Sequence, residues 1–257
     1  MQKLFLTPSE IAESVINSGV RKANLSASKQ LILGVLAGSF IAFGAQGSNM
    51  VIHAMSNAGL AKLVAGIIFP AGLIMVILAG AELFTGNSLM IIALMERLIT
   101  FKQLIKSWLI VYIGNFAGGL LIAYLMAKSG LISSNKNLEL FTINTALTKI
   151  NLSFMQAFIR GVLCNWLVCL AVWMSFGADD FTGKISAIFF PVCLFVASGF
   201  EHSIANMYYI PAGIFAGGAI TWPEMFNNLL PVTLGNITGG VFFAGVIYWY
   251  CYVRKFY

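Results

Sequence analysis

The chain has 257 residues, of which 59% are hydrophobic and only 9% are charged. A soluble domain usually carries about 25% charged residues, so this composition excludes a soluble protein with a polar surface. The 25 glycines are typical of a membrane protein, in which glycine lets helices approach closely. The length predicts a single membrane domain over residues 1–257.

The first predicted element is an amphipathic helix over residues 7–23. Thr7 and Glu10 form a capping-box pattern, and Pro8 stands at the first helical position. An apolar stripe at helical spacing follows. Two roles are open, an anchor on the cytoplasmic membrane surface or a lid over a pore mouth, and the pattern favours the anchor.

Six apolar segments follow the amphipathic helix. They cover residues 31–55, 63–94, 104–127, 155–176, 185–210 and 226–252. A helix that spans a bilayer needs about 20 apolar residues. The second and fifth segments contain polar interruptions, which predicts that these two helices are broken. The expected fold is an all-α membrane protein with six transmembrane helices.

The distribution of Lys and Arg predicts the orientation, because basic residues favour the cytoplasmic side of a membrane. The side that would hold both termini carries most of them: Lys3, Arg21, Lys22, Lys29, Arg97, Lys102, Lys106, Lys184, Arg254 and Lys255. The opposite side carries Lys62, Lys128, Lys136 and Lys149. We therefore expect a multi-pass protein of a bacterial or archaeal cytoplasmic membrane with both termini in the cytoplasm. This bias accounts for the net charge of +6 without a nucleic-acid partner.

An internal repeat relates the two halves of the chain. Four motifs recur in the same order: GVLA at 34–37 and GVLC at 161–164, FP at 69–70 and 190–191, Glu82 with Asn87 and Glu201 with Asn206, and GNFAGG at 114–119 and GNITGG at 235–240. Each half contains three crossings, so the second half enters from the opposite side. The sequence predicts a first repeat over 31–127 and an inverted second repeat over 155–252, with a substrate site near mid-bilayer.

The two interruptions carry the chemistry. Each places ionisable groups inside an apolar segment, where such groups are costly and usually face a cavity. His202 can donate a hydrogen bond and pass a proton, and pseudo-symmetry places Thr85 opposite it. The simpler interpretations are a packed histidine bonded to a backbone carbonyl, and a Thr85 hydroxyl bonded to its own helix. Two half-helix N-termini at the breaks would favour an anion.

The remaining polar residues of the interruptions are expected to be structural. We expect Glu82 and Glu201 to accept hydrogen bonds from backbone amides that the breaks expose, and Asn87 and Asn206 to support them. A carboxylate facing an anion would repel it.

Three stretches resemble the signatures of the formate/nitrite transporter family. They are GAELFTG at residues 80–86, GVLCNWLVCLA at 161–171, and FEHSIANM at 200–207. The resemblance covers all six segments in order. It implies an aquaporin-like fold, a homopentamer with one pore per subunit, and passage of formate, nitrite or hydrosulfide. The overall resemblance is closest to the hydrosulfide channel branch, and a proton-coupled formate/nitrite symporter is the alternative.

The resemblance also implies roles for individual residues. His202 and Thr85 would form the central pair. Lys149 would be a vestibule lysine whose hydrogen-bond network includes Asn165 and Glu201. The hydrophobic constrictions would be formed by Leu83 and Phe195, with Phe69 and Leu73 as further candidates.

Three other function classes are less consistent with the sequence. A membrane enzyme would use Ser198 with His202, but no second catalytic block accompanies them. A neutral-solute channel conflicts with Lys149 and with the absence of an Asn-Pro-Ala pair at the breaks. A structural scaffold would not need buried Glu and His. The four cysteines and two histidines lack metal-ligand spacing, so we expect free thiols, no metal and no cofactor.

Overall fold

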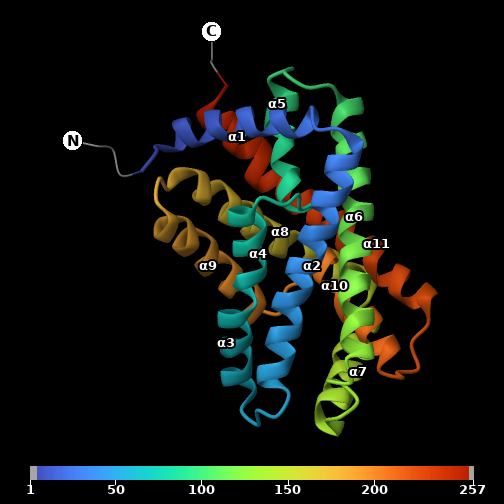
Figure 1. Cartoon of the computed structure of the whole chain (residues 1–257). Coiled ribbons are helices and arrows are strands. Elements are labelled where there is room, and N and C mark those ends of the chain that lie inside the picture. The colour runs from blue at the N-terminus through green and yellow to red at the C-terminus, as the bar shows by residue number, and fades with distance from the viewer. Residues whose placement is uncertain (1–4, 255–257) are drawn as a thin grey trace.

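The computed structural model describes residues 5–254, and within that range the chain is helical and contains no strand (Figure 1). Lys3 and Lys255, which contribute to the predicted charge bias, lie outside the described residues. The all-α prediction is confirmed for the described part of the chain.

The first half of the chain runs from α1 to α6. Its elements are α1 (Pro8–Ala23), α2 (Ala27–Ile52), α3 (Ala58–Ile68), α4 (Pro70–Ala79), the short 3-10 helix η1 (Gly86–Leu89), α5 (Met90–Met95) and α6 (Phe101–Lys128). Pro70 separates α3 from α4 without ending the helical stretch, because proline is tolerated at the first position of a helix. Residues between α4 and η1 are not helical.

The second half runs from α7 to α12. Its elements are α7 (Lys136–Ile150), α8 (Phe154–Gly177), α9 (Phe181–Ala197), α10 (Ser203–Phe215), α11 (Trp222–Thr238), the π-helical η2 (Gly239–Val246) and α12 (Ile247–Tyr252). The last three form one continuous helical stretch, 222–252. Non-helical residues separate α9 from α10.

Five helical stretches in the described residues are long and apolar enough to cross a membrane. They are Ala27–Ile52, Ala58–Ala79, Phe101–Lys128, Phe154–Gly177 and Trp222–Tyr252. The fifth predicted segment, 185–210, is divided between α9 with 17 residues and α10 with 13, so neither reaches spanning length alone.

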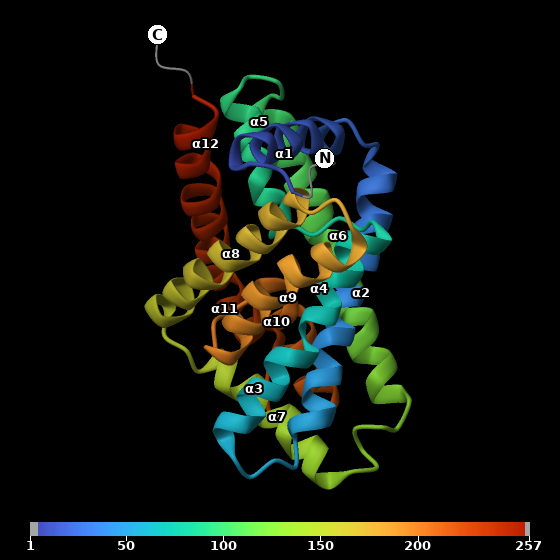
Figure 2. The same cartoon turned by 90° about the vertical axis from the view of Figure 1, so that its left-hand side faces the viewer.

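Two further helices lie at opposite ends of the bundle (Figures 1 and 2). The α1 helix has the predicted capping box and lies across the end where α5 and α12 are found. The α7 helix lies at the other end and packs against α10 and α11. The apolar segments assign no element to residues 128–154, where the structure has this helix. The α7 helix precedes the second repeat as α1 precedes the first.

Glycines bring the crossing helices into backbone contact. A Cβ on Gly118 of α6 would lie 2.1 Å from the Val35 carbonyl oxygen of α2, and a Cβ on Gly239 would lie 2.1 Å from the Val162 carbonyl oxygen of α8. Such close approach is typical of helix pairs in membranes. The repeated glycine motifs at 114–119 and 235–240 therefore hold the same helix crossing together in each half.

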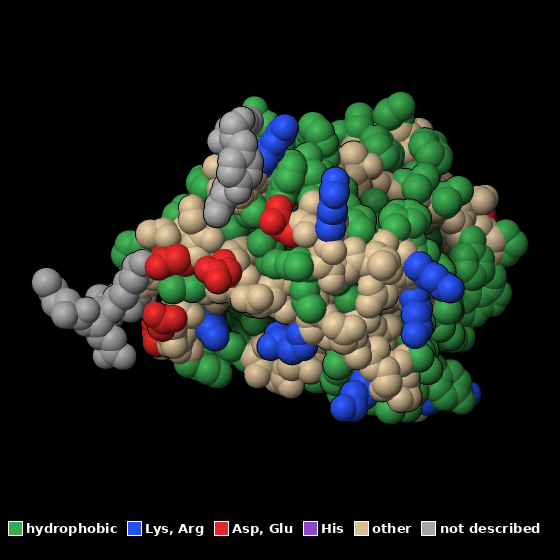
Figure 3. Space-filling model, turned by 90° about the horizontal axis from the view of Figure 1, so that it is seen from above, with side chains coloured by type: hydrophobic (Ala, Val, Ile, Leu, Met, Phe, Trp, Pro, Cys, Tyr) green, Lys and Arg blue, Asp and Glu red, His purple; other side chains and the backbone are tan. Residues whose placement is uncertain are grey.

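The end of the molecule that carries α1 has a mixed surface. Figure 3 shows Lys and Arg side chains spread over this end, with apolar side chains among them and around its rim. Large apolar side chains also stand exposed along the helices, for example Ile113 on α6 and Phe190 on α9, which are 59% and 69% exposed. An apolar outer surface suits contact with lipid.

Candidate functional site

The first interruption, residues 80–85, is joined to α1 by an ion pair. Gly80 ends α4 with φ +82°, a left-handed conformation that glycine adopts at low cost. Glu82 then lies 2.8 Å from the Lys22 ammonium, and the Asn87 amide donates to the same carboxylate oxygen over 2.8 Å. Lys22 also donates to Asn87 Oδ1 at 2.9 Å, so the three side chains form a closed triad.

The second interruption, residues 198–202, repeats this arrangement at the opposite end. Gly199 has φ +72° after α9. Lys149 of α7 donates to both carboxylate oxygens of Glu201 at 3.1 Å, and Asn206 donates to Glu201 Oε2 over 2.7 Å. The Asn206 amide also contacts Asn228, which donates to the Lys149 carbonyl. Both ion pairs are largely buried, so loss of one partner would leave a costly unpaired charge.

Two asparagines hold the backbone of the interruptions. Asn115 of α6 accepts from the Phe84 amide at 2.9 Å and donates to the carbonyls of Gly34 and Glu82 at 2.8 and 2.9 Å. Asn236 of α11 forms the equivalent three bonds, with the Ser203 amide and with the carbonyls of Gly161 and Glu201. These two residues satisfy backbone groups that would otherwise be unpaired in an apolar setting.

The predicted role of the two glutamates is corrected by these contacts. The side chains of Glu82 and Glu201 accept from lysine and asparagine side chains, not from backbone amides. The backbone amides of Glu82 and Glu201 instead donate to the carbonyls of Leu33 and Arg160. Asn115 and Asn236 were missed, although their place in the repeated GNFAGG and GNITGG motifs was a signal that could have identified them.

The centre of the molecule is formed by Thr85 and His202, whose Oγ1 and Nε2 lie 2.9 Å apart. Both residues are buried, with exposed fractions of 0% and 3%. His202 caps α10, because its Nδ1 accepts from the Ala205 amide at 3.2 Å. A backbone amide can only donate, so Nδ1 carries no proton and the neutral ring has its proton on Nε2. The ring therefore donates to Thr85 Oγ1, and the Thr85 hydroxyl proton is left for a further partner.

Two cavities approach this centre from opposite ends. The α1-side cavity has a volume of about 430 Å³, and Lys22, Glu82, Leu73 and Leu83 are in its wall. The α7-side cavity has a volume of about 450 Å³; Lys149, Glu201, Phe69, Phe195 and His202 are in its wall. No described residue lines both cavities.

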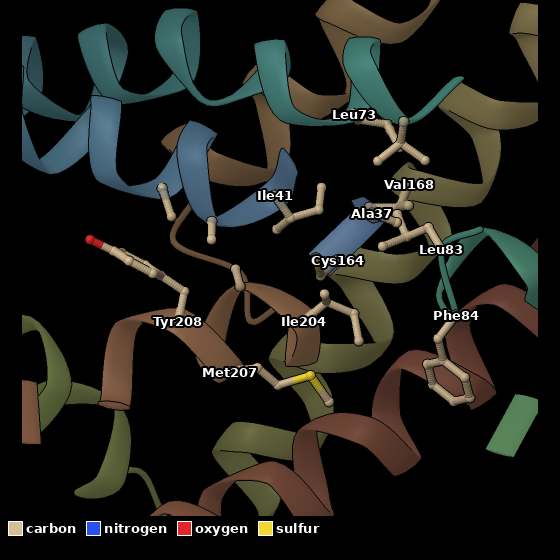
Figure 4. Close-up of a cluster of buried hydrophobic side chains, with 14 of the residues drawn as sticks. Ala37, Ile41, Leu73, Leu83, Phe84, Cys164, Val168, Ile204, Met207 and Tyr208 are labelled. Carbon is tan, nitrogen blue, oxygen red and sulfur yellow. The ribbon is translucent and has the colours of Figure 1, made fainter. Parts of the chain in front are cut away.

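The four predicted constriction residues are all buried, Leu73 and Leu83 in the wall of the α1-side cavity and Phe69 and Phe195 in that of the α7-side cavity. The rings of Phe69 and Phe195 meet edge to face with centroids 5.6 Å apart, and the Phe195 ring lies 6.0 Å from the His202 ring. Leu73 and Leu83 belong to the buried apolar cluster drawn in Figure 4. Of the four, Phe195 thus contacts His202 directly, and Phe69 packs against Phe195.

Asn165 lies beside the centre and is linked to Lys149 indirectly, through Asn236 and Glu201. Its amide donates to the carbonyls of Thr85 and Asn236 at 3.2 and 2.7 Å, and to the Ser88 hydroxyl at 3.2 Å. It thereby links α8 to the first interruption and to α11. The asparagines nearer to Lys149 are Asn206, which donates to Glu201, and Asn228, which donates to the Lys149 carbonyl.

Lys22 is the functional candidate that the sequence analysis did not single out. It stands twelve residues before Gly34, and Lys149 stands twelve residues before Gly161. The equivalent position of the two lysines in the internal repeat could therefore have identified Lys22. The charge bias placed Lys22 only among cytoplasmic basic residues, whereas the structure pairs it with Glu82 in the cavity wall.

Comparison with known proteins agrees with this geometry. Residues 9–250 match the profile of the formate/nitrite transporter family. The chain belongs to this family. It is 45% identical to an uncharacterized transporter, YrhG, of Bacillus subtilis over 98% of the chain and 95% of that protein. It is 40% identical to a probable formate transporter of Methanothermobacter thermautotrophicus over 99% of the chain and 100% of that protein.

A solved structure has the same fold. It is a pentameric formate channel with formate bound, matched with a TM-score of 0.78 and 34% identity over 89% of the chain and 98% of that protein. Membership of a transporter family makes the chain a membrane channel or transporter and not an enzyme. The structure also provides no Ser198–His202 pair, because both ring nitrogens of His202 contact other residues.

Proposed function

We propose that this chain forms a homopentamer in which each subunit conducts small monovalent weak-acid anions through its own pore. The observation that carries the proposal is a pair of lysine-lined cavities, one reaching His202 and the other Leu83 and Gly86 on either side of Thr85. The number of subunits is proposed from the related pentameric formate channel.

The charges in both cavities favour anions. Arg21, Lys22 and Lys184 line the α1-side cavity together with the single carboxylate of Glu82. The α7-side cavity contains Lys62 and Lys149 against Glu201. An excess of positive charge in a concave, apolar-walled site raises the local concentration of anions. A neutral-solute channel would have no use for this excess.

The constriction sets which anions pass. A charge that moves through an apolar ring without water pays a large desolvation cost, and strongly hydrated ions are stopped there. The Thr85 hydroxyl can donate a hydrogen bond to the passing ion, and His202 orients that hydroxyl by donating to its oxygen. Transfer of a proton to a weak-acid anion, directly or through water, would remove most of the remaining cost. A proton-coupled symporter would use the same residues, and pH-dependent flux measurements separate the two mechanisms.

Formate is the first candidate substrate. The names of related proteins favour it over hydrosulfide, the anion expected from the sequence. Nitrite and hydrosulfide remain the other two substrates to test, because the lysine, threonine and histidine contacts described above would suit any small monovalent anion.

The topology belongs to the same proposal. We infer six crossings in two inverted three-helix repeats, with the fifth crossing made by α9 and α10 together. Residues 1–257 would act as one membrane domain in a bacterial or archaeal cytoplasmic membrane. The ends of α1 and α12 lie at the same end of the molecule, which supports two termini on the cytoplasmic side (Figure 1).

The experiment is anion flux into proteoliposomes at several pH values, comparing formate, nitrite and hydrosulfide with glycerol. We expect flux of at least one anion, and about tenfold lower flux in Lys149→Met, where Glu201 stays in the wall without its cation. Lys136→Met is the matched control, because Lys136 lies on the same helix but its side chain is 71% exposed. Glycerol flux without anion flux would overturn the proposal.

A further inference from the structure

Asn49 of α2 is a buried polar residue that none of the contacts described above explains. It lies in the wall of the α7-side cavity and is only 3% exposed. Its Nδ2 is buried without a hydrogen-bond partner, and no described residue bonds to its side chain. Buried amide groups nearly always have partners, since an unpaired one costs about 1–3 kcal/mol.

A second unpaired donor lies one turn earlier on the same face of α2. Gln46 is 6% exposed and its Nε2 also has no partner. The Tyr208 hydroxyl of α10 donates to Gln46 Oε1, which holds the Gln46 amide against the helix that His202 caps. Residues three apart on a helix are neighbours, so α2 presents Gln46 and Asn49 together.

The opposite cavity has no such donor. The repeat that aligns Lys22 with Lys149 and Gly34 with Gly161 aligns Asn49 with Phe176. Phe176 lines the α1-side cavity. The two cavities thus share their lysine–glutamate–asparagine triads, but an amide in one is replaced by an apolar ring in the other.

The Lys149 ammonium has a hydrogen-bond donor available for a ligand beside Asn49. An ammonium group has three donors. Two of the Lys149 donors reach the oxygens of Glu201 at 3.1 Å. Nothing in the described chain takes the third, and the Lys149 ammonium lies 5.1 Å from the centre of the Tyr209 ring, which is also in the cavity wall.

We propose that Asn49 is a substrate-contacting residue that gives the α7-side cavity an anion subsite with no counterpart in the α1-side cavity. The Asn49 amide donates to a small monovalent anion held near Lys149, before that anion reaches His202. A neutral donor suits this position, because conduction requires binding that is weak enough for release. The inference rests on the proposed anion channel and adds a residue that sets its affinity from one side.

The test measures the half-saturating formate concentration from each side in vesicles of known orientation. Asn49→Leu keeps the size of the side chain and removes the donor. We expect its half-saturating concentration to rise about tenfold from the α7 side, the usual effect of losing a hydrogen bond to a charged ligand, and to change little from the α1 side. Asn49→Asp should raise it further, because the carboxylate repels the anion. Phe176→Leu is the matched control and should leave the α7-side value unchanged.

Thermal unfolding distinguishes ligand contact from a structural role. Asn49 has no partner in the folded protein, so Asn49→Leu should unfold at the same temperature as the wild type or higher. A lower unfolding temperature, or an unchanged α7-side half-saturation in a variant that conducts, would overturn the inference. Absence of anion flux in the wild-type protein would instead refute the proposed function.

Discussion

The buried polar residues of this protein are arranged around its two interruptions. Each interruption has a lysine and an asparagine that both donate to one glutamate, Lys22 and Asn87 to Glu82 and Lys149 and Asn206 to Glu201. The set is closed by a Lys22–Asn87 bond in the first interruption, whereas Asn206 donates to Asn228 in the second, and in both the lysine still faces a cavity. The centre between them is asymmetric: the residue after Glu201 is His202, whereas the residue after Glu82 is Leu83.

This asymmetry predicts a specific effect of replacing the histidine. His202→Asn should retain the α10 cap, since an asparagine oxygen accepts from a backbone amide as Nδ1 does. It removes the imidazole, the one central side chain that can both accept and donate a proton. We expect formate flux to persist and its dependence on pH to flatten, as measured in proteoliposomes at a series of external pH values.

Thr85→Val is the companion variant for this measurement. It removes the hydroxyl that contacts His202 without adding or removing a proton-exchanging group. It should lower the rate and leave the shape of the wild-type pH profile. An unchanged pH profile in His202→Asn would refute the proton-handling role of the histidine.

Among the elements, the two halves stabilise their non-helical interruptions in the same way. One asparagine from the last helix of each half, Asn115 on α6 and Asn236 on α11, bonds to the interruption and to the first helix. The interruptions are thus held by side chains from other helices, and neither can keep its shape alone.

Removing one of these asparagines should destabilise the protein. Asn236→Leu leaves the Ser203 amide and the carbonyls of Gly161 and Glu201 without their partners. We expect a loss of about 3 kcal/mol or more, from the cost of unpaired buried groups. The measurement is the thermal unfolding temperature in detergent.

Asn227→Leu controls for the loss of an asparagine from the same helix. Asn227 is exposed on α11, so its replacement should change the unfolding temperature little. Equal unfolding temperatures for Asn236→Leu and Asn227→Leu would contradict the role assigned to Asn236.

At the scale of the whole molecule, equivalent features of the two halves lie at opposite ends. The α1 helix and Lys22 face one cavity, and the α7 helix and Lys149 face the other. The described ends of the chain both lie at the α1 end (Figure 2). The orientation of the protein in the membrane therefore decides which cavity opens to the cytoplasm. It also decides which side of the membrane the Asn49 subsite faces.

Labelling of a native cysteine tests this orientation. Cys251 is exposed on α12, near the end of the described chain, whereas Cys164 and Cys169 are buried. If the termini are cytoplasmic, a membrane-impermeant maleimide should label Cys251 only after the cells are permeabilised. Cys251→Ser should abolish that labelling. Labelling of Cys251 in intact cells would reverse the proposed orientation.

The sequence by itself determined much of the architecture. Low charge and long apolar segments required a membrane protein, and segment lengths placed most helix boundaries within a few residues, as for 155–176 against α8. The recurring motifs also predicted that His202 and Thr85 meet, which their 2.9 Å contact confirms. These features depend on composition and on spacing along the chain, which can be read from the sequence without a structure.

Only the tertiary structure decided which polar groups pair. These pairings depend on contacts between helices far apart in sequence. They include the partners of Glu82, Glu201 and Asn165, the backbone hydrogen bonds of Asn115 and Asn236, and the unpaired donor of Asn49. The short α7 helix was missed because its apolar pattern is weak, and its form depends on packing against α10 and α11. Pairing is set by distance in space, and a pattern along one helix does not contain that distance.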